Sequence, residues 1–142
     1  MNHRVFGRKL HRNKRERAQL FKTLVYHFVL HGRLVSTEGK VKAVRPLLEK
    51  LVTKAKRGET QRALLLKEIG NKEIVNKLLE NAKTFSEVPG GYTKVIKLEA
   101  RVGDNGKQLL MVWSREIAEE KKAEVVESPA VLPKPKKTNK KA

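Results

Sequence analysis

The sequence predicts an α+β domain: a helix, a strand, three more helices and a β-hairpin, with the helices packed on one face of a three-stranded mixed sheet. Three observations support this prediction. Apolar residues recur at helical spacing as far as Phe85, and Pro89-Gly90-Gly91 then ends that pattern. After this break, apolar residues alternate with their neighbours at a period of two. Hydrophobic residues make up 39% of the 142 residues, which is enough for one modest core and too many for a wholly disordered chain.

The first helix is expected over about residues 13–30, because Leu20, Leu24 and Phe28 stand four residues apart and Gly32 follows. If this helix begins earlier, Arg8, Arg12, Arg15 and Lys22 lie along one cationic line of it. Residues 33–36 are β-prone and form the predicted first strand.

The second helix is expected to open with Thr37 as its cap and to end before Gly58. Pro46 lies inside it and should bend or interrupt it. A short helix over about residues 60–69 ends at Gly70, and Asn71 caps a fourth helix. The apolar lines of these helices predict their buried faces: Val41, Val44, Leu48, Leu51, Val52 and Ala55 in the second, and Ile74, Leu78, Ala82 and Phe85 in the fourth.

The last two strands are predicted from alternation. Ile96, Leu98 and Ala100 alternate with charged residues, and Leu109, Met111 and Trp113 alternate with their neighbours. Between the two runs, Asn105-Gly106 predicts the type I′ turn of a hairpin. Trp113 and Phe85 fall on predicted core faces, so we interpret them as packing residues.

Charge divides the chain into a domain and a tail. The formal net charge is +18, and residues 1–22 hold eight Lys and Arg against a single acid, Glu16. The sign reverses over residues 116–127, where five glutamates face two lysines, and lysines among prolines follow. We therefore expect an RNA-binding domain over residues 1–115 and a charged, disordered tail over residues 116–142.

Several function classes lack the residues that they need. The chain has no cysteine and one aspartate, Asp104, so clustered metal ligands and a cysteine nucleophile are not expected. His27 and His31 are spaced like a zinc pair, but Phe28 occupies the place of the required glutamate. No enzyme activity, metal, cofactor or small-molecule substrate is expected. The sequence has no apolar run of membrane-spanning length and no apolar signal-peptide core, which predicts a cytoplasmic protein without membrane contact.

The basic N-terminus is the strongest functional signal. Nucleic acid is the abundant polyanion of the cytoplasm, and arginine forks match phosphate geometry. We predict RNA contacts from these residues of the segment: His3, Arg4, Arg8, Lys9, His11, Arg12, Lys14, Arg15, Arg17 and Lys22. The turn before the hairpin is either a bare turn or a turn that touches RNA phosphate, with Tyr92 available to stack or hydrogen-bond.

Several motifs resemble one known family. They are Met1-Asn2-His3-Arg4, Gly7-Arg8-Lys9-Leu10, Arg12-Asn13, Arg45-Pro46-Leu47-Leu48-Glu49, Thr53-Lys54-Ala55-Lys56, Gly90-Gly91-Tyr92-Thr93-Lys94 and Arg101-Val102-Gly103-Asp104-Asn105. In order and spacing, over about residues 1–115, the chain resembles the L-seventeen family of bacterial large-subunit ribosomal proteins. The resemblance implies a small α+β domain that binds large-subunit ribosomal RNA near the exit of the nascent-peptide tunnel, beside neighbouring ribosomal proteins and without catalysis.

The resemblance also implies RNA-contacting positions. In the N-terminal segment it adds Gly7 and Asn13 to the residues above, in the second helix it implies Lys40, Lys42, Arg45 and Lys56, and in the turn and hairpin Tyr92, Lys94 and Arg101. Leu64 to Leu66 replace a stretch that is often richer in arginine, so the short helix is expected to contact less RNA. The alternative is a DNA-coating architectural protein, which would share the charge but not these motifs.

Overall fold

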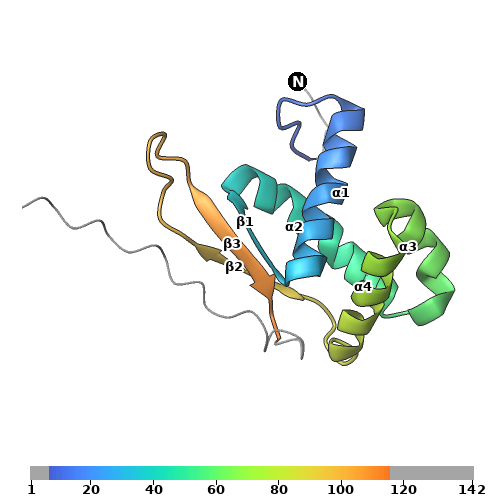
Figure 1. The fold of residues 1–142 in the computed structure, drawn as a ribbon. Helices are drawn as coiled ribbons and strands as arrows, with labels where there is room; N and C mark the ends of the chain where they lie inside the picture. Colours follow the sequence, from blue (N-terminus) through green and yellow to red (C-terminus); the bar gives the residue numbers. More distant parts are fainter. Residues whose placement is uncertain (1–6, 116–142) are drawn as a thin grey trace, which may run out of the picture.

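The computed structural model describes residues 7–115, and its element order is the one that the sequence predicts (Figure 1). The elements are α1 (Lys14–His31), β1 (Arg33–Thr37), α2 (Glu38–Ala55), a short 3₁₀ turn η1 (Gly58–Gln61), α3 (Arg62–Ile69), α4 (Lys72–Thr84), β2 (Thr93–Lys97) and β3 (Gln108–Trp113). The predicted α+β class is confirmed. The charged tail and His3 and Arg4 lie outside the described residues.

The end of α1 and the start of α4 follow the predicted capping chemistry, whereas Thr37 precedes α2 without a side-chain cap hydrogen bond. Gly32 has a left-handed φ of 69° and donates its backbone N–H to the Phe28 carbonyl over 2.8 Å, which ends α1. Asn71 caps α4, because its side chain accepts a hydrogen bond from the Glu73 N–H at 2.9 Å. Pro46 lies exposed in the middle of α2 and does not interrupt it.

The sheet is antiparallel throughout, with the order β1-β3-β2, so the predicted mixed sheet is wrong. The helical crossover returns the chain to the end of the sheet where β1 starts, and β2 therefore runs in the direction of β1. β3 then inserts between these two strands and opposes both. Val35 and Ile96 both pair with Leu110 across this central strand.

The predicted two-residue turn at Asn105-Gly106 is also wrong. β2 ends at Lys97, and the connection to β3 is a longer loop closed by a bridge between Arg101 and Gly106. Asn105 has a positive φ of 51°, but Gly106 does not, whereas a type I′ turn needs both. β2 begins earlier than predicted, so Thr93 and Val95 face the core, and Ile96 is 49% exposed.

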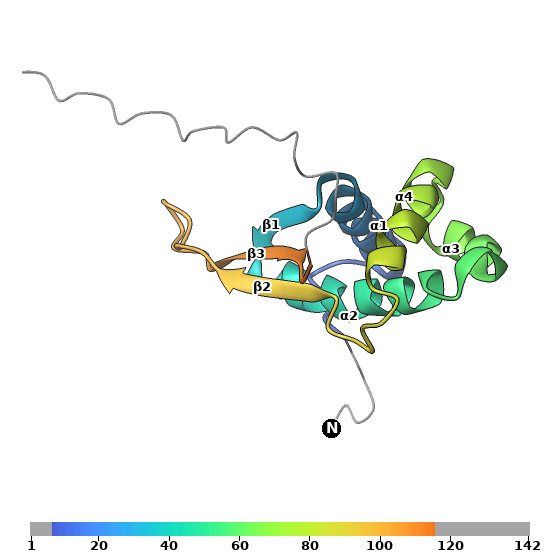
Figure 2. The same ribbon diagram turned by 90° about the horizontal axis from the view of Figure 1, so that it is seen from below.

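The helices all lie to one side of the sheet (Figure 2). Core residues from α1, α2 and the sheet, such as Phe28, Leu48 and Met111, are fully buried. The Trp113 ring lies 4.5 Å from the Phe28 ring and 5.6 Å from the Phe85 ring, centroid to centroid. Trp113 and Phe85 are therefore packing residues, as predicted, and no helix among residues 7–115 covers the other sheet face.

Candidate nucleic-acid interface

The segment before α1 is an irregular loop, so the predicted cationic line from Arg8 to Lys22 along one helix is wrong. α1 begins only at Lys14, and Leu10 and His11 have left-handed φ values of 55° and 51°. At the start of the helix, the Glu16 carboxylate accepts a hydrogen bond from the Asn13 N–H at 3.1 Å. The positive φ values reverse the chain, and a helix extended toward residue 8 cannot contain them.

Hydrogen bonds within the loop hold its shape. The Arg12 guanidinium donates to the Leu10 carbonyl at 3.1 Å, and the Arg17 guanidinium donates to the Arg12 carbonyl at 3.3 Å. The loop also approaches the first turn of α2, where a Cβ on Gly39 would lie 3.7 Å from both Arg8 Nη1 and Leu10 Cδ2. The loop therefore lies beside the basic residues at the start of α2.

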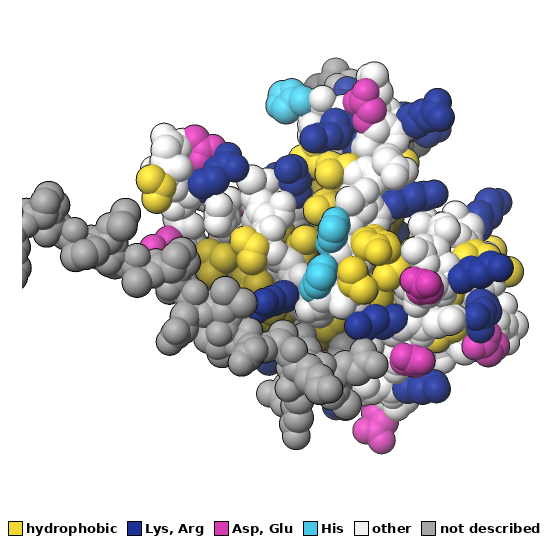
Figure 3. All heavy atoms as spheres, in the orientation of Figure 1, with side chains coloured by type: hydrophobic (Ala, Val, Ile, Leu, Met, Phe, Trp, Pro, Cys, Tyr) yellow, Lys and Arg dark blue, Asp and Glu magenta, His cyan; other side chains and the backbone are white. Residues whose placement is uncertain are grey.

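A cationic cleft of about 510 Å³ lies between this loop, α1 and α2. Arg8, Lys9, Arg17 and Lys42 line it, together with Gly7, Phe21, Ala43 and Pro46. Lys42 pairs with Glu38 at its edge, and that hydrogen bond and charge hold the pKa of Glu38 below its usual value. Lys and Arg side chains surround the loop and the first turns of α1 in the upper part of Figure 3. An anion such as a phosphate is the ligand that this charge favours.

Other predicted cations stand free on the surface. The following side chains have no hydrogen bond or ion pair to another residue between 7 and 115: Lys9, Lys14, Arg15, Lys22 and Lys94. All five are exposed, as is His11, and Lys40 is half-buried near the start of α2. Because no side chain or backbone group of the described part of the chain competes for these ammonium and guanidinium groups, they are available to phosphate.

A different arrangement holds the cations at the junction of α2 and β2. Arg45 donates to the Thr93 carbonyl at 3.3 Å, and Lys56 donates to the Val88 carbonyl at 2.6 Å and lies 5.5 Å from the centre of the Tyr92 ring. These two residues therefore fix the chain around the turn. Tyr92 itself is 1% exposed and contacts Phe85, so its ring is not accessible for stacking on a base, while an RNA contact through the surrounding turn stays a prediction.

Glu49 is a residue at this junction whose role the sequence does not reveal. Its carboxylate accepts hydrogen bonds from the Tyr92 N–H at 3.0 Å, the Thr93 N–H at 3.1 Å and the Thr93 hydroxyl at 2.7 Å. It thus joins α2 to the start of β2 and positions Lys94 at the surface. The nearest sequence signal for this role is an acidic residue among the cations between Arg45 and Lys56.

The loop between β2 and β3 carries its own ion pair. The Arg101 guanidinium pairs with the Asp104 carboxylate, and the Gly106 N–H donates to the same carboxylate at 3.1 Å. The Arg101 hydrogen bond, followed by that of Gly106, lowers the pKa of Asp104 to about 2. Arg101 is exposed, but its charge is partly balanced before any RNA arrives.

Comparison with known proteins identifies the family. The family model described as "Ribosomal protein L17" matches residues 20–112. The chain belongs to the ribosomal protein L17 family. A protein of Coprothermobacter proteolyticus named "Large ribosomal subunit protein bL17" is 41% identical, with 81% of this chain and 100% of that protein aligned. Proteins of the same name from Neorickettsia sennetsu and an Anaeromyxobacter species are 42% and 38% identical, over 73% and 74% of this chain and 92% and 68% of theirs.

Family membership makes the chain a structural ribosomal component and not an enzyme. Within the described residues, no group of three His, Asp or Glu side chains is placed to hold a metal ion. His27 and His31 stack with their ring centroids 6.1 Å apart and are both exposed. No helix among residues 7–115 is long and apolar enough to cross a membrane.

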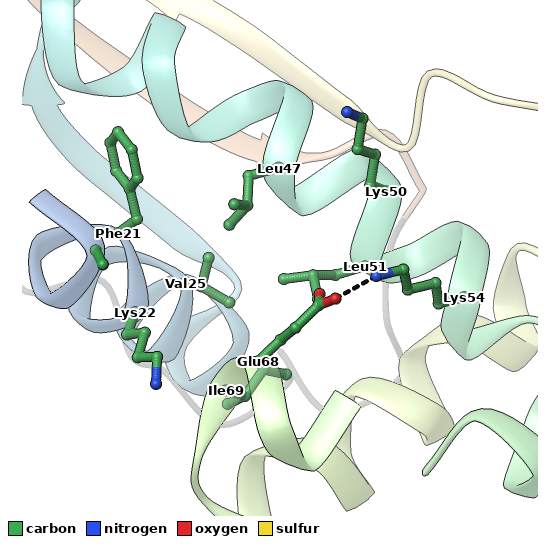
Figure 4. Close-up of a pocket in the computed structure, with 10 residues that line it drawn as sticks. Phe21, Lys22, Val25, Leu47, Lys50, Leu51, Lys54, Glu68 and Ile69 are labelled. Carbon is green, nitrogen blue, oxygen red and sulfur yellow. Dashed lines mark hydrogen bonds and ion pairs between the residues drawn. The ribbon is translucent and has the colours of Figure 1, made fainter. Parts of the chain in front are cut away.

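A second cavity of the L17-family domain, of about 430 Å³, lies between α1, α2 and α3 (Figure 4). Its lining is mostly apolar, with Val25, Leu51 and Ile69 among the residues that form it. Lys54 pairs with Glu68 at the edge, while the ammonium ends of Lys22 and Lys50 point away from the cavity. This lining does not suit phosphate, so we do not include the cavity in the candidate interface.

Proposed function

We propose that this chain is a structural constituent of the large ribosomal subunit, which binds and stabilises folded ribosomal RNA in the cytoplasm. The observation that carries the proposal is the surface formed by the residue 7–13 loop, the first turns of α1 and the start of α2. There the cleft gathers four Lys and Arg side chains, and cations without a partner among residues 7–115 lie near it. Family membership and the relatives' names support the same assignment.

The mode of binding follows from the groups on this surface. Lys and Arg donate to phosphate oxygens, while the buried Tyr92 leaves the described surface without the aromatic platform that base stacking at the turn would need. The cations are held on a folded loop and two helices, so their spacing is fixed before RNA binds. We therefore propose recognition of RNA shape through the backbone, with neighbouring ribosomal proteins beside it and the nascent-peptide tunnel exit as the location.

Sedimentation of cell lysates tests the assignment. The chain should migrate with large subunits on a sucrose gradient after a high-salt wash. Its loss into the soluble or nucleoid fraction would overturn the proposal and favour the DNA-coating alternative. Mapping RNA crosslinks from Arg15 within intact large subunits tests the location, and crosslinks remote from the tunnel exit would overturn that part alone.

Substitution of Arg8, Arg12 and Arg15 by glutamine tests the surface itself. Because all three side chains are exposed, we expect the circular dichroism spectrum and the thermal midpoint to stay close to those of the parent chain. Retention on large subunits after the salt wash should fall. Unchanged retention would contradict the role of the N-terminal loop.

We also propose that the RNA-binding domain ends near residue 115 and that residues 116–142 are a separate extension. β3 ends at Trp113, and the family match ends at residue 112. Truncation after Arg115 should change the free energy of unfolding by no more than about 0.5 kcal/mol. A much larger loss would show that the extension belongs to the folded domain.

A further inference from the structure

The sheet face that is left uncovered by α1 to α4 carries an apolar row. Val35 and Ile96 both pair with Leu110, so the three side chains lie side by side on one face of the sheet. Val35 is 54% exposed and Ile96 is 49% exposed, while Met111 and Leu109, which point to the other face, are buried. We call this surface, with Arg33, Val112 and Lys94 of the adjacent row, the outer sheet face.

Charge borders the apolar row on one side. Arg33 and Lys94 lie opposite Val112 on the two edge strands, and both are exposed. Figure 3 shows hydrophobic side chains gathered over the strands, separate from the Lys and Arg side chains around the start of α1. The outer sheet face therefore differs in chemistry from the cationic cleft.

We propose that the outer sheet face docks a neighbouring protein of the ribosomal subunit, through a segment that presents aliphatic side chains to Val35, Leu110 and Ile96 and carboxylates to Arg33 and Lys94. This inference rests on the proposed function. Aliphatic side chains gain stability by contact with other apolar groups, whereas RNA would leave them against phosphate and sugar. A second copy docked through the same face would offer Arg33 and Lys94 no carboxylate, because the outward-facing residues of the three strands include no Asp or Glu.

The chain's own acidic segment, residues 116–127, also carries aliphatic and acidic side chains, but it lies outside the residues matched to the family model. Val35, Ile96 and Leu110, in contrast, lie within the residues matched to the family model. The family match stops at residue 112, so an occupant from residues 116–127 would not be one that the matched region shares across the family. A partner protein, in contrast, is available to every member of a ribosomal family.

Crosslinking in purified large subunits tests the proposal. A photoreactive amino acid is placed at Val35, and in a parallel sample at Arg15, which lies on the proposed RNA surface. After illumination, nuclease treatment should leave the Val35 adduct as a protein–protein species joined to a second ribosomal protein, whose crosslinked peptide holds aliphatic and acidic residues. The Arg15 adduct should contain RNA instead.

A second substitution in the Val35 sample gives the matched control. Ile96→Asp should reduce the protein adduct roughly tenfold, because it places a carboxylate in the apolar contact, whereas Ile96→Leu should preserve it. Adducts of Val35 with RNA alone, with residues 116–127, with a second copy or with no partner would each overturn the proposal. Failure of either labelled chain to enter the subunit would count instead against the proposed function.

Discussion

The N-terminal surface and the α2–β2 junction both carry cations that the sequence marks as RNA-binding, yet the structure uses them differently. Lys9, Lys14 and Arg15 have no partner among residues 7–115. Arg45 and Lys56 donate to backbone carbonyls and hold the turn before β2 in place. Similar positive charge is thus left for the proposed RNA contacts in one region and holds the fold in the other, and only the partners of each side chain distinguish the two arrangements.

Among the substitutions that test this contrast, we expect the largest change in the free energy of unfolding at Tyr92. Because the ring is buried and packs against Phe85, Tyr92→Ala should lower the free energy of unfolding by about 3–5 kcal/mol. Its hydroxyl has only a long, 3.4 Å contact with the Pro89 carbonyl, so Tyr92→Phe should cost less than about 1 kcal/mol. Chemical denaturation measures both. If a fully folded Tyr92→Phe variant bound RNA more weakly than the parent chain, Tyr92 would have to contact RNA directly, which would contradict this account.

Glu49 gives the next largest effect. Glu49→Ala removes the acceptor of three hydrogen bonds to Tyr92 and Thr93, and should lower the free energy of unfolding by about 2–3 kcal/mol. Glu68→Ala is the matched control, since its exposed pair with Lys54 contributes at most about 1 kcal/mol. Equal losses in the two variants would contradict the structural role of the junction.

The smallest effect is the pH response of the Arg101–Asp104 loop. Asp104 has its pKa lowered to about 2 in the folded chain from an ordinary value of 3.8, so the pair contributes above about pH 4 and is lost as the pH falls through 2. The chemical shift of the Gly106 amide should follow this titration in the parent chain. In Asp104→Asn it should no longer change over the same pH range. A midpoint near the ordinary value would show that the pair does not form in solution.

Local rules predicted most of the fold, because the helix ends depend on nearby residues such as Gly32 and Asn71. They did not predict the sheet direction or the loop after β2, since these depend on pairing between distant strands. They also placed Ile96 in a strand of alternating apolar and charged residues, but they did not predict the pairing register that leaves its side chain exposed. For the candidate site, the sequence indicated where the cations are, but the burial of Tyr92 and the hydrogen bonds of Glu49 arise only from tertiary packing.

The most direct test compares two triple glutamine variants that each remove three positive charges. One changes Lys9, Lys14 and Arg15, and the other changes Arg45, Lys56 and Arg101. Both are checked for folding by circular dichroism at the assay temperature, and the affinity for purified large-subunit ribosomal RNA is measured across a salt series. The first variant should reduce the log–log salt slope by about 2–3, and the second by less than about 1. Equal reductions in the two variants would contradict the separation of RNA-binding cations from structural ones.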